Sequence, residues 1–263
     1  MTEPLRDDEG LDVATGCAAV ASAIAEAGYA ALPAAAARAL FDPAGRALGG
    51  AAWAGFAASW AALEPDAHMA DGGRYRLRRH AVFQLNPGED GILRAPHQPH
   101  YQGLQFNGLN GGVQRWFAPV TPETGEGPAL AALLGGARAV FDAVAMAEGT
   151  PAPGWQVEMH QFRIQARGDE AGKPTPEGMH RDGVDYVLVA LIGRENVGGG
   201  VTGIRVDGRQ ADPEGERSFT LAEPLDAVLL DDRRVWHGVT PIAPLDPGRP
   251  GHRDVLVLTF RKL

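Results

Sequence analysis

The sequence has 263 residues, of which 44% are hydrophobic, so it is long and apolar enough to bury a full core. Its formal net charge of −9 argues against a nucleic-acid or anionic-membrane partner, because both surfaces attract basic proteins. A single cysteine, Cys17, excludes an internal disulfide and fits a reducing compartment. The first ten residues are acidic, unlike a secretory signal, so we expect a cytoplasmic protein that acts on a small molecule.

The first part of the chain, residues 12–63, is rich in alanine and predicts helices. Its larger apolar side chains recur three or four residues apart, which is the spacing of one helix face. The clearest series is Trp53, Phe56, Trp60 and Leu63. We expect two or three helices here, in an N-terminal helical region that extends over residues 1–73.

Extended segments begin near Tyr75. Residues 75–87 alternate in character and end at a proline, which predicts a strand. Residues 100–112, HYQGLQFNGLNGG, are a second extended candidate with a glycine-rich turn. Residues 129–147 return to helical spacing and form the last long helix that we expect.

After Trp155 the chain is a series of short apolar runs separated by Gly, Pro, Asp or Asn. Short strands at such close spacing, without helices between them, predict a sandwich or barrel rather than a parallel α/β sheet. We therefore expect an α+β fold in which the N-terminal helices pack on a two-sheet β core formed by residues 74–263. No linker is evident between the two parts, so one compact domain is expected.

His180, Arg181 and Asp182 lie at the entrance of one of these runs. On a strand, residues two apart point to the same side, so His180 and Asp182 could bind one metal ion. His237 is the best third ligand, because it begins another extended run and the intervening length suits strands that return the chain beside the first. The alternative for His180 and Asp182 is a solvated turn before an ordinary strand.

Two histidines and one carboxylate, with open positions opposite them, are the ligands of non-haem Fe(II) oxygenases. A 2-oxoacid cosubstrate needs a cation for its far carboxylate, and Arg253 opens the last strand with a planar group that matches a carboxylate. Arg261 lies on the same face of that strand and competes for this role. An ion pair with Asp254 or Asp232 would instead give Arg253 a structural role.

Several stretches together resemble the bacterial family of 2-oxoglutarate and Fe(II)-dependent dioxygenases that includes L-isoleucine 4-hydroxylase. They are PTPEGMHRDGVDYV, IGRENVGGGVT, WHGVTPI and HRDVLVLTFR, with RYRLRRHAVF and HYQGLQFNGLNGGVQRWF as weaker support. The resemblance implies a double-stranded β-helix, a jelly-roll and cupin-like core. It also implies Fe(II) bound by His180, Asp182 and His237, and 2-oxoglutarate anchored by Arg253. O2 would be consumed, ascorbate would activate the enzyme in vitro, and the substrate would be a free aliphatic L-amino acid such as Ile, Leu, Met or Val.

A free amino acid needs a cation for its carboxylate, an acceptor for its ammonium and an apolar wall. Arg163 is the preferred cation, with Gln161 beside it, because both alternate with apolar residues of 155–166 and should point away from the packed face. His160 is expected on that packed face. The other candidate cations are Arg74, Arg76, Arg79 and Arg115. Four histidines are expected to be ordinary loop or surface residues: His68, His80, His97 and His100.

Two other functions would suit the same barrel. A cupin-like protein could hold Zn or Mn in the same ligands and perform non-redox chemistry, which needs neither O2 nor 2-oxoglutarate. A sensor could bind an amino acid or oxoacid without turnover. A nucleic-acid demethylase is disfavoured by the negative charge. The sequence leaves open which amino acid and which carbon react, and which oligomer forms.

Overall fold

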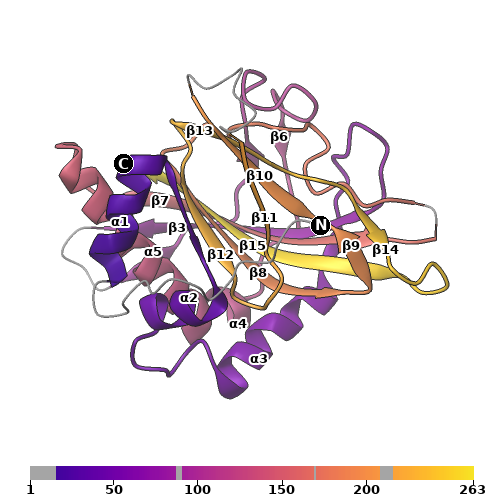
Figure 1. Ribbon diagram of the computed structural model, residues 1–263, viewed down its shortest axis with the longest axis horizontal. Coiled ribbons are helices and arrows are strands. Elements are labelled where there is room, and N and C mark those ends of the chain that lie inside the picture. Colours follow the sequence, from indigo (N-terminus) through magenta and orange to yellow (C-terminus); the bar gives the residue numbers. More distant parts are fainter. Residues whose placement is uncertain (1–15, 87–90, 169, 208–215) are drawn as a thin grey trace.

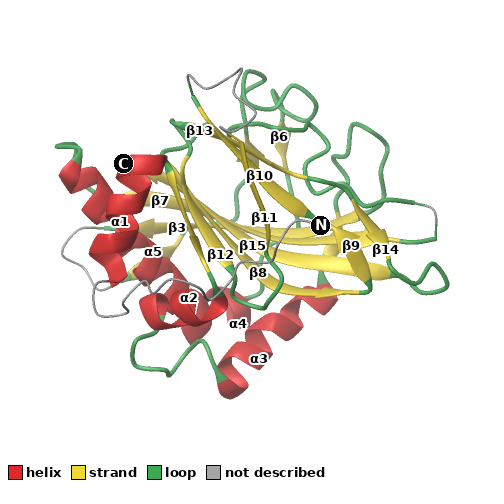
Figure 2. Cartoon of the chain, in the orientation of Figure 1, coloured by secondary structure: helices red, strands yellow, loops and turns green. Residues whose placement is uncertain are grey.

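The computed structural model describes residues 16–86, 91–168, 170–207 and 216–263. The helices gather on one side of the molecule, and long curved strands and loops fill the rest (Figure 1, Figure 2). The expectations for the first fifteen residues and for a strand end at Pro87 fall outside the described residues.

The alanine-rich region forms three helices among the described residues. They are α1 (Gly16–Ala27), α2 (Ala34–Phe41) and α3 (Gly50–Ala58), followed by the 3-10 turn η2 (Ser59–Ala62). Between α1 and α2 lies strand β1 (Tyr29–Leu32), which pairs with a strand of the main sheet. This strand was not predicted from the sequence, because alanine favours helices in isolation and only tertiary pairing overrides that preference.

The later helices are α4 (Pro122–Gly125) and α5 (Pro128–Ala147), and α5 matches the predicted long helix. Residues 122–147 are long and apolar enough to cross a membrane by length and composition, but half of the apolar stretch is buried inside the protein. Ile24, Leu32 and Trp60 of the N-terminal part are buried in the same cluster as α5 and the sheet. The helical part and the β part therefore share one hydrophobic core.

The main sheet is antiparallel, with the strand order β1-β12-β8-β15-β7-β3-β2 and β4 paired to β3. Its further strands are β2 (Glu64–Pro65), β3 (Arg76–Leu85), β4 (Ile92–Arg94), β7 (Trp155–Ala166), β8 (Tyr186–Glu195), β12 (Ala227–Asp231) and β15 (Gly251–Lys262). The runs predicted as strands after Trp155 are thus present. One face of this sheet packs on the helices.

The other face meets a smaller sheet, β11 (Glu216–Thr220), β10 (Val201–Val206) and β13 (Val235–Val239). Val187, Leu191 and Val255 of the main sheet form a second apolar cluster with Ile204 and Phe219 of the smaller one. Two more pairs are β9 (Val197–Gly199) with β14 (Ile242–Pro244) and β5 (His100–Tyr101) with β6 (Gln114–Arg115). The two facing sheets make the predicted sandwich.

Residues 100–112 differ from the extended segment that the sequence analysis expected. Only His100 and Tyr101 are in a strand, and the remainder forms turns. The side chain of Asn107 accepts from the amide N of Asn110 at 2.7 Å, a local bond that favours a turn over a sheet ladder. This loop lies over the pocket described next.

Candidate metal centre

His180 and His237 are placed side by side by their backbones. They form an isolated antiparallel bridge in which each amide N donates to the other residue's carbonyl, at 2.9 and 3.0 Å. Both residues are buried, and their ring centroids are 4.5 Å apart. His237 lies on β13, whereas His180 lies in the segment before β8 rather than on a strand as expected. The bridge still brings both imidazoles into one pocket.

Asp182 joins them from a tightly held turn. The amide N–H groups of residues 182–184 all donate to the buried carboxylate of Asp232, at 2.9, 2.7 and 3.1 Å. Gly183 has a φ of 80°, and a Cβ there would lie 2.4 Å from Phe106, so the turn requires glycine. Asp232 thereby fixes the turn that presents Asp182 to the two imidazoles.

The three side chains fit a divalent cation. Nε2 of His180 lies 3.6 Å from one Asp182 oxygen, and Nε2 of His237 lies 3.4 Å from the other. Ligands at about 2.1 Å from one ion and at right angles to each other are roughly 3 Å apart. Nδ1 of His180 donates to the Gly178 carbonyl at 3.1 Å, which leaves Nε2 free to bind metal. Nε2 of His237 is buried and has no hydrogen-bond partner among the described residues.

The charges of the site favour a cation. Burial lowers the pKa of His237, but the carboxylates of Asp182 and Asp232 outweigh this effect and raise it to about 10. Burial likewise raises the pKa of Asp182, but the two imidazoles hold it well below its usual range. A metal ion that binds here replaces protons on the histidines, as metal ligation generally does.

Arg253 lies in the same pocket with an uncompensated charge. It is 1% exposed, and its Nε and one Nη have no partner among the described residues. Burial and the nearby Arg194 lower its pKa to about 10. Gly200, whose φ is 72°, leaves it room, since a Cβ there would lie 3.2 Å from Cδ of Arg253. The glycine run before β10 is thus a tight turn that borders the arginine.

The two carboxylates that could have formed an ion pair with Arg253 have other partners. Asp254 binds Arg163, and Asp232 binds the turn at residues 182–184. Arg261 also borders the pocket, but it is exposed and donates to the carbonyl of Gly183 at 3.2 Å.

Strand β7 faces the opposite way from the expectation. His160, Phe162 and Ile164 line the pocket. Arg163 instead forms a two-pronged ion pair with Asp254, at 2.8 and 2.7 Å, and Gln161 donates to Ser59 of the helical part at 2.8 Å. Neither is among the residues that line the pocket. The alternation of β7 was predicted correctly, but its apolar face forms the pocket wall. The expectation that Arg163 and Gln161 bind the substrate is therefore wrong.

Histidines that the sequence analysis treated as ordinary gather around one carboxylate. Glu158 accepts from Nε2 of His80 at 2.9 Å and from Nδ1 of His100 at 2.6 Å. His160 stacks on His80 with the ring centroids 4.9 Å apart. The recurrence of Arg76, Arg78 and His80 at every second position of a strand could have placed His80 on a polar strand face, but the sequence has no signal that joins it to His100 and Glu158.

The loop over the pocket reaches the metal centre. Nε2 of Gln102 lies 3.2 Å from the carbonyl oxygen of Asp182 and 3.5 Å from its carboxylate. Asn107 donates to the Gln102 side chain at 3.1 Å and fixes its orientation. Partners of this kind orient a metal ligand.

A family model of the 2OG-Fe dioxygenases matches residues 57–259. The chain belongs to the 2OG-Fe dioxygenase family. Members of this family use Fe(II), 2-oxoglutarate and O2, and the His180, Asp182 and His237 cluster supplies the matching donor set. Nε2 of His237 and two nitrogens of the Arg253 guanidinium have no hydrogen-bond partner among the described residues, which is consistent with a metal and an anionic cosubstrate in this dioxygenase.

Individual relatives agree with the family. The chain is 29% identical over 113 residues to 3(1)-hydroxy-L-isoleucine 4-dioxygenase of Pantoea ananatis, and this alignment spans 44% of that enzyme's length. It is similar to the crystal structure of a bsmA homologue from Methylobium petroleophilum, with 40% identity, a TM-score of 0.81 and coverage of 94% and 93% of the two chains. The crystal structure of IDO from Bacillus thuringiensis shares the fold, at 16% identity, a TM-score of 0.72 and coverage of 94% and 99%. The fold of such oxygenases is the double-stranded β-helix.

Proposed function

We propose that this dioxygenase hydroxylates an unactivated C–H bond of a free aliphatic L-amino acid and releases succinate and CO2 from 2-oxoglutarate. The observation that carries the proposal is the composition of the pocket, which joins the candidate metal ligands to an apolar wall and to charged groups of both signs. The wall includes Phe162, Val255 and Val257, and the charged groups include Arg115 and Glu158. The relative in Pantoea ananatis, whose name includes hydroxy-L-isoleucine, supports an amino-acid substrate.

The roles of the residues follow from their chemistry. Bound Fe(II) would supply the activation of O2, and His180, Asp182 and His237 would hold it while leaving positions open. Arg253 would bind the far carboxylate of 2-oxoglutarate through two parallel N–H groups. The apolar wall would exclude water and hold the aliphatic side chain beside the metal. We also place the enzyme in the cytoplasm, which its single, half-buried cysteine supports.

The test is a screen of the common free L-amino acids with protein, Fe(II), ascorbate and 2-oxoglutarate. We expect succinate release together with the gain of one oxygen atom by Ile, Leu, Met or Val, and no turnover of the corresponding amide or of a peptide. Turnover of a peptide with none of the free amino acids would contradict the proposal. Turnover without O2 or 2-oxoglutarate would indicate non-redox metal chemistry, and binding without succinate would indicate a sensor.

A further inference from the structure

The pocket holds a second buried cation besides Arg253. Arg115 on β6 is 2% exposed and lines the pocket, and its Nε is buried without a hydrogen-bond partner among the described residues. Its nearest ring contact, Phe117, lies 5.8 Å away. Burial lowers its pKa, the sign of a charge that its surroundings do not fully compensate. A buried cationic N–H group without a partner is costly, so an anion from solution is its natural partner.

The neighbouring arginines also have one buried nitrogen without a hydrogen-bond partner, Nη2 of Arg76 and Nε of Arg78, but each has a carboxylate within ion-pair distance. Nε of Arg76 binds Asp66 at 2.8 Å, and the same carboxylate lies 3.6 Å from Arg78. Arg78 also donates to Nδ1 of His160 at 2.7 Å and lies over the ring of Phe117, 3.5 Å from its centroid. Arg115 is therefore the least satisfied of the three cations on this side of the pocket.

A fixed negative charge lines the same pocket as Arg115. Strand pairing places Arg115 directly opposite His100, and His100 donates to Glu158. His80 donates to the same oxygen of Glu158, Oε2, so no described residue donates to Oε1. Burial raises the pKa of Glu158, but the two imidazole donors hold it far below its usual range. Glu158 is thus an ionised acceptor with one oxygen to spare.

The cluster of His80, His100, Glu158 and His160 is compact enough to suggest a second metal, but its protons argue against one. Arginine only donates, so Nδ1 of His160 must accept from Arg78, and its Nε2, 3.9 Å from Glu158, carries the proton. His80 and His100 direct their N–H groups at Glu158 as well. A metal ion would have to displace these protons, and the nearby Arg78 and Arg115 repel a cation.

We propose that Arg115 binds the α-carboxylate of the substrate and that Oε1 of Glu158 accepts from its α-ammonium. This inference rests on the proposed function, since it assumes a free amino acid. The charges agree with a zwitterion, because the three guanidiniums on this side of the pocket are balanced by two lining carboxylates and by Asp66, which pairs with two of the arginines. The arginines are Arg76, Arg78 and Arg115, and the lining carboxylates are Glu158 and Glu177. A second dicarboxylate would need an excess of cations here.

The experiment is an anaerobic calorimetric titration of the metal-loaded protein with 2-oxoglutarate present. The probes are L-isoleucine, L-leucine, L-methionine and L-valine, followed by the amide and the deaminated acid of the tightest binder. Arg115→Gln is expected to weaken the amino acid about 10- to 150-fold, the usual range for a lost charge-assisted hydrogen bond, and to leave the amide unchanged. Glu158→Gln is expected to weaken the amino acid but not the deaminated acid.

The controls separate the subsite from folding and from the proposed function. Arg217→Gln, at an exposed position of β11, should bind every probe like wild type, and both pocket variants should retain their 2-oxoglutarate affinity. If Arg115→Gln also loses 2-oxoglutarate binding, a second variant, Arg115→Lys, is tested. Its affinity for the free amino acid is divided by its affinity for the amide. A ratio lower than that of wild type supports the subsite, and a ratio equal to that of wild type overturns it.

Three results would overturn the inference in different ways. If wild type hydroxylates an amino acid and Arg115→Gln binds it equally well, the subsite is wrong and the proposed function stands. If wild type binds none of the four free amino acids, the proposed function fails and the subsite fails with it. A second bound metal per chain that is lost in Glu158→Gln would replace the subsite by a metal site.

Discussion

The two arginines on the pocket side of β15 differ in what their guanidinium groups can bind. Arg253 is buried with unpaired N–H groups, whereas Arg261 is exposed and bound to a backbone carbonyl. We therefore expect Arg253→Gln to weaken 2-oxoglutarate about 10- to 150-fold, and Arg261→Gln to change it by less than about threefold. Calorimetric titration of the metal-loaded protein measures both. The opposite ranking would move the cosubstrate site to Arg261.

Glu158 makes the stability of the folded protein depend on pH. Its folded pKa is lowered, so the stability that it contributes is present above its unfolded pKa of about 4.3 and is lost as the pH falls through the folded value. We expect Glu158→Gln to be less stable than wild type near neutral pH, and the difference to shrink between about pH 5 and pH 3. Thermal unfolding followed by circular dichroism over this range checks it. A difference that stays constant with pH would contradict the assignment of an ionised Glu158.

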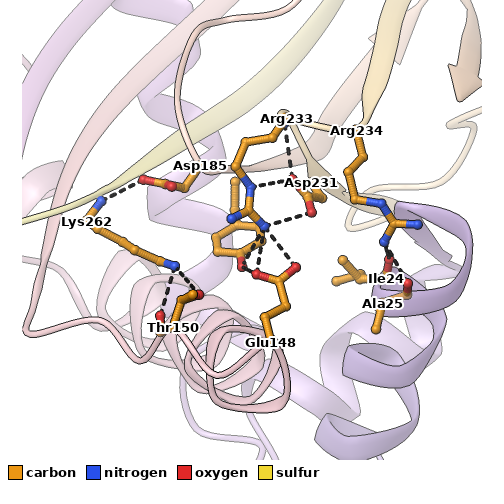
Figure 3. A network of polar contacts seen from close by, with 10 residues as sticks. Ile24, Ala25, Glu148, Thr150, Asp185, Asp231, Arg233, Arg234 and Lys262 are labelled. Atoms are coloured by element: carbon orange, nitrogen blue, oxygen red, sulfur yellow. Dashed lines mark hydrogen bonds and ion pairs between the residues drawn. The ribbon is translucent and has the colours of Figure 1, made fainter. Parts of the chain in front are cut away.

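A polar network joins the turn between β12 and β13 to the C-terminal ends of α1 and α5 (Figure 3). Arg233 bridges Asp231 and Glu148 at 2.8 and 2.9 Å, which joins the end of β12 to the end of α5. Arg234 donates to carbonyls of the last turn of α1, among them those of Ile24 at 3.1 Å and Ala25 at 2.6 Å. These bonds anchor the turn from which β13 carries His237 into the pocket.

Arg234 supplies the capping interaction for α1, because it places a cation and donors at the carbonyl end of the helix. Arg234→Ala is expected to lower the free energy of unfolding by about 1 to 2 kcal/mol, and Arg217→Ala by less than about 0.5 kcal/mol. Urea unfolding measures both variants. An Arg234→Ala protein as stable as the Arg217→Ala control would show that the cap contributes nothing.

The sequence predicts where strands form, but it does not predict which face of a strand lines the pocket. The strands after Trp155 were predictable, because β-branched runs separated by turn residues have few alternative structures. Which side of β7 lines the pocket was not predictable. Both sides of the strand are buried, one under helices and one in the pocket, and the alternation of residues does not distinguish them. The candidate ligands His180, Asp182 and His237 were predictable from their spacing. The histidines around Glu158 were not, since they come from three separate segments that only the tertiary fold joins.

The N-terminal helices and the helix-facing side of the main sheet share the large hydrophobic core. Trp60 is fully buried, and its Nε1 donates to the carbonyls of Phe162 at 3.1 Å and Val255 at 3.2 Å, beneath the pocket wall. We expect residues 74–263 alone to show no cooperative thermal transition and no 2-oxoglutarate binding, because the helix-facing side of the sheet would be exposed. A truncated protein that unfolds cooperatively and binds 2-oxoglutarate like the full chain would contradict this account.

We propose that His180, Asp182 and His237 hold the iron with which this enzyme hydroxylates a free amino acid. Turnover under isotopically labelled O2 tests this proposal. Succinate and the hydroxylated amino acid are measured together in wild type and in three variants, His180→Ala, Asp182→Ala and His237→Ala. We expect equal amounts of the two products in wild type, with label in the new hydroxyl group, and no coupled turnover in any variant, although each keeps its circular dichroism spectrum. Near-normal coupled turnover in any one variant would remove that residue from the metal centre, and an unlabelled product in wild type would contradict the reaction itself.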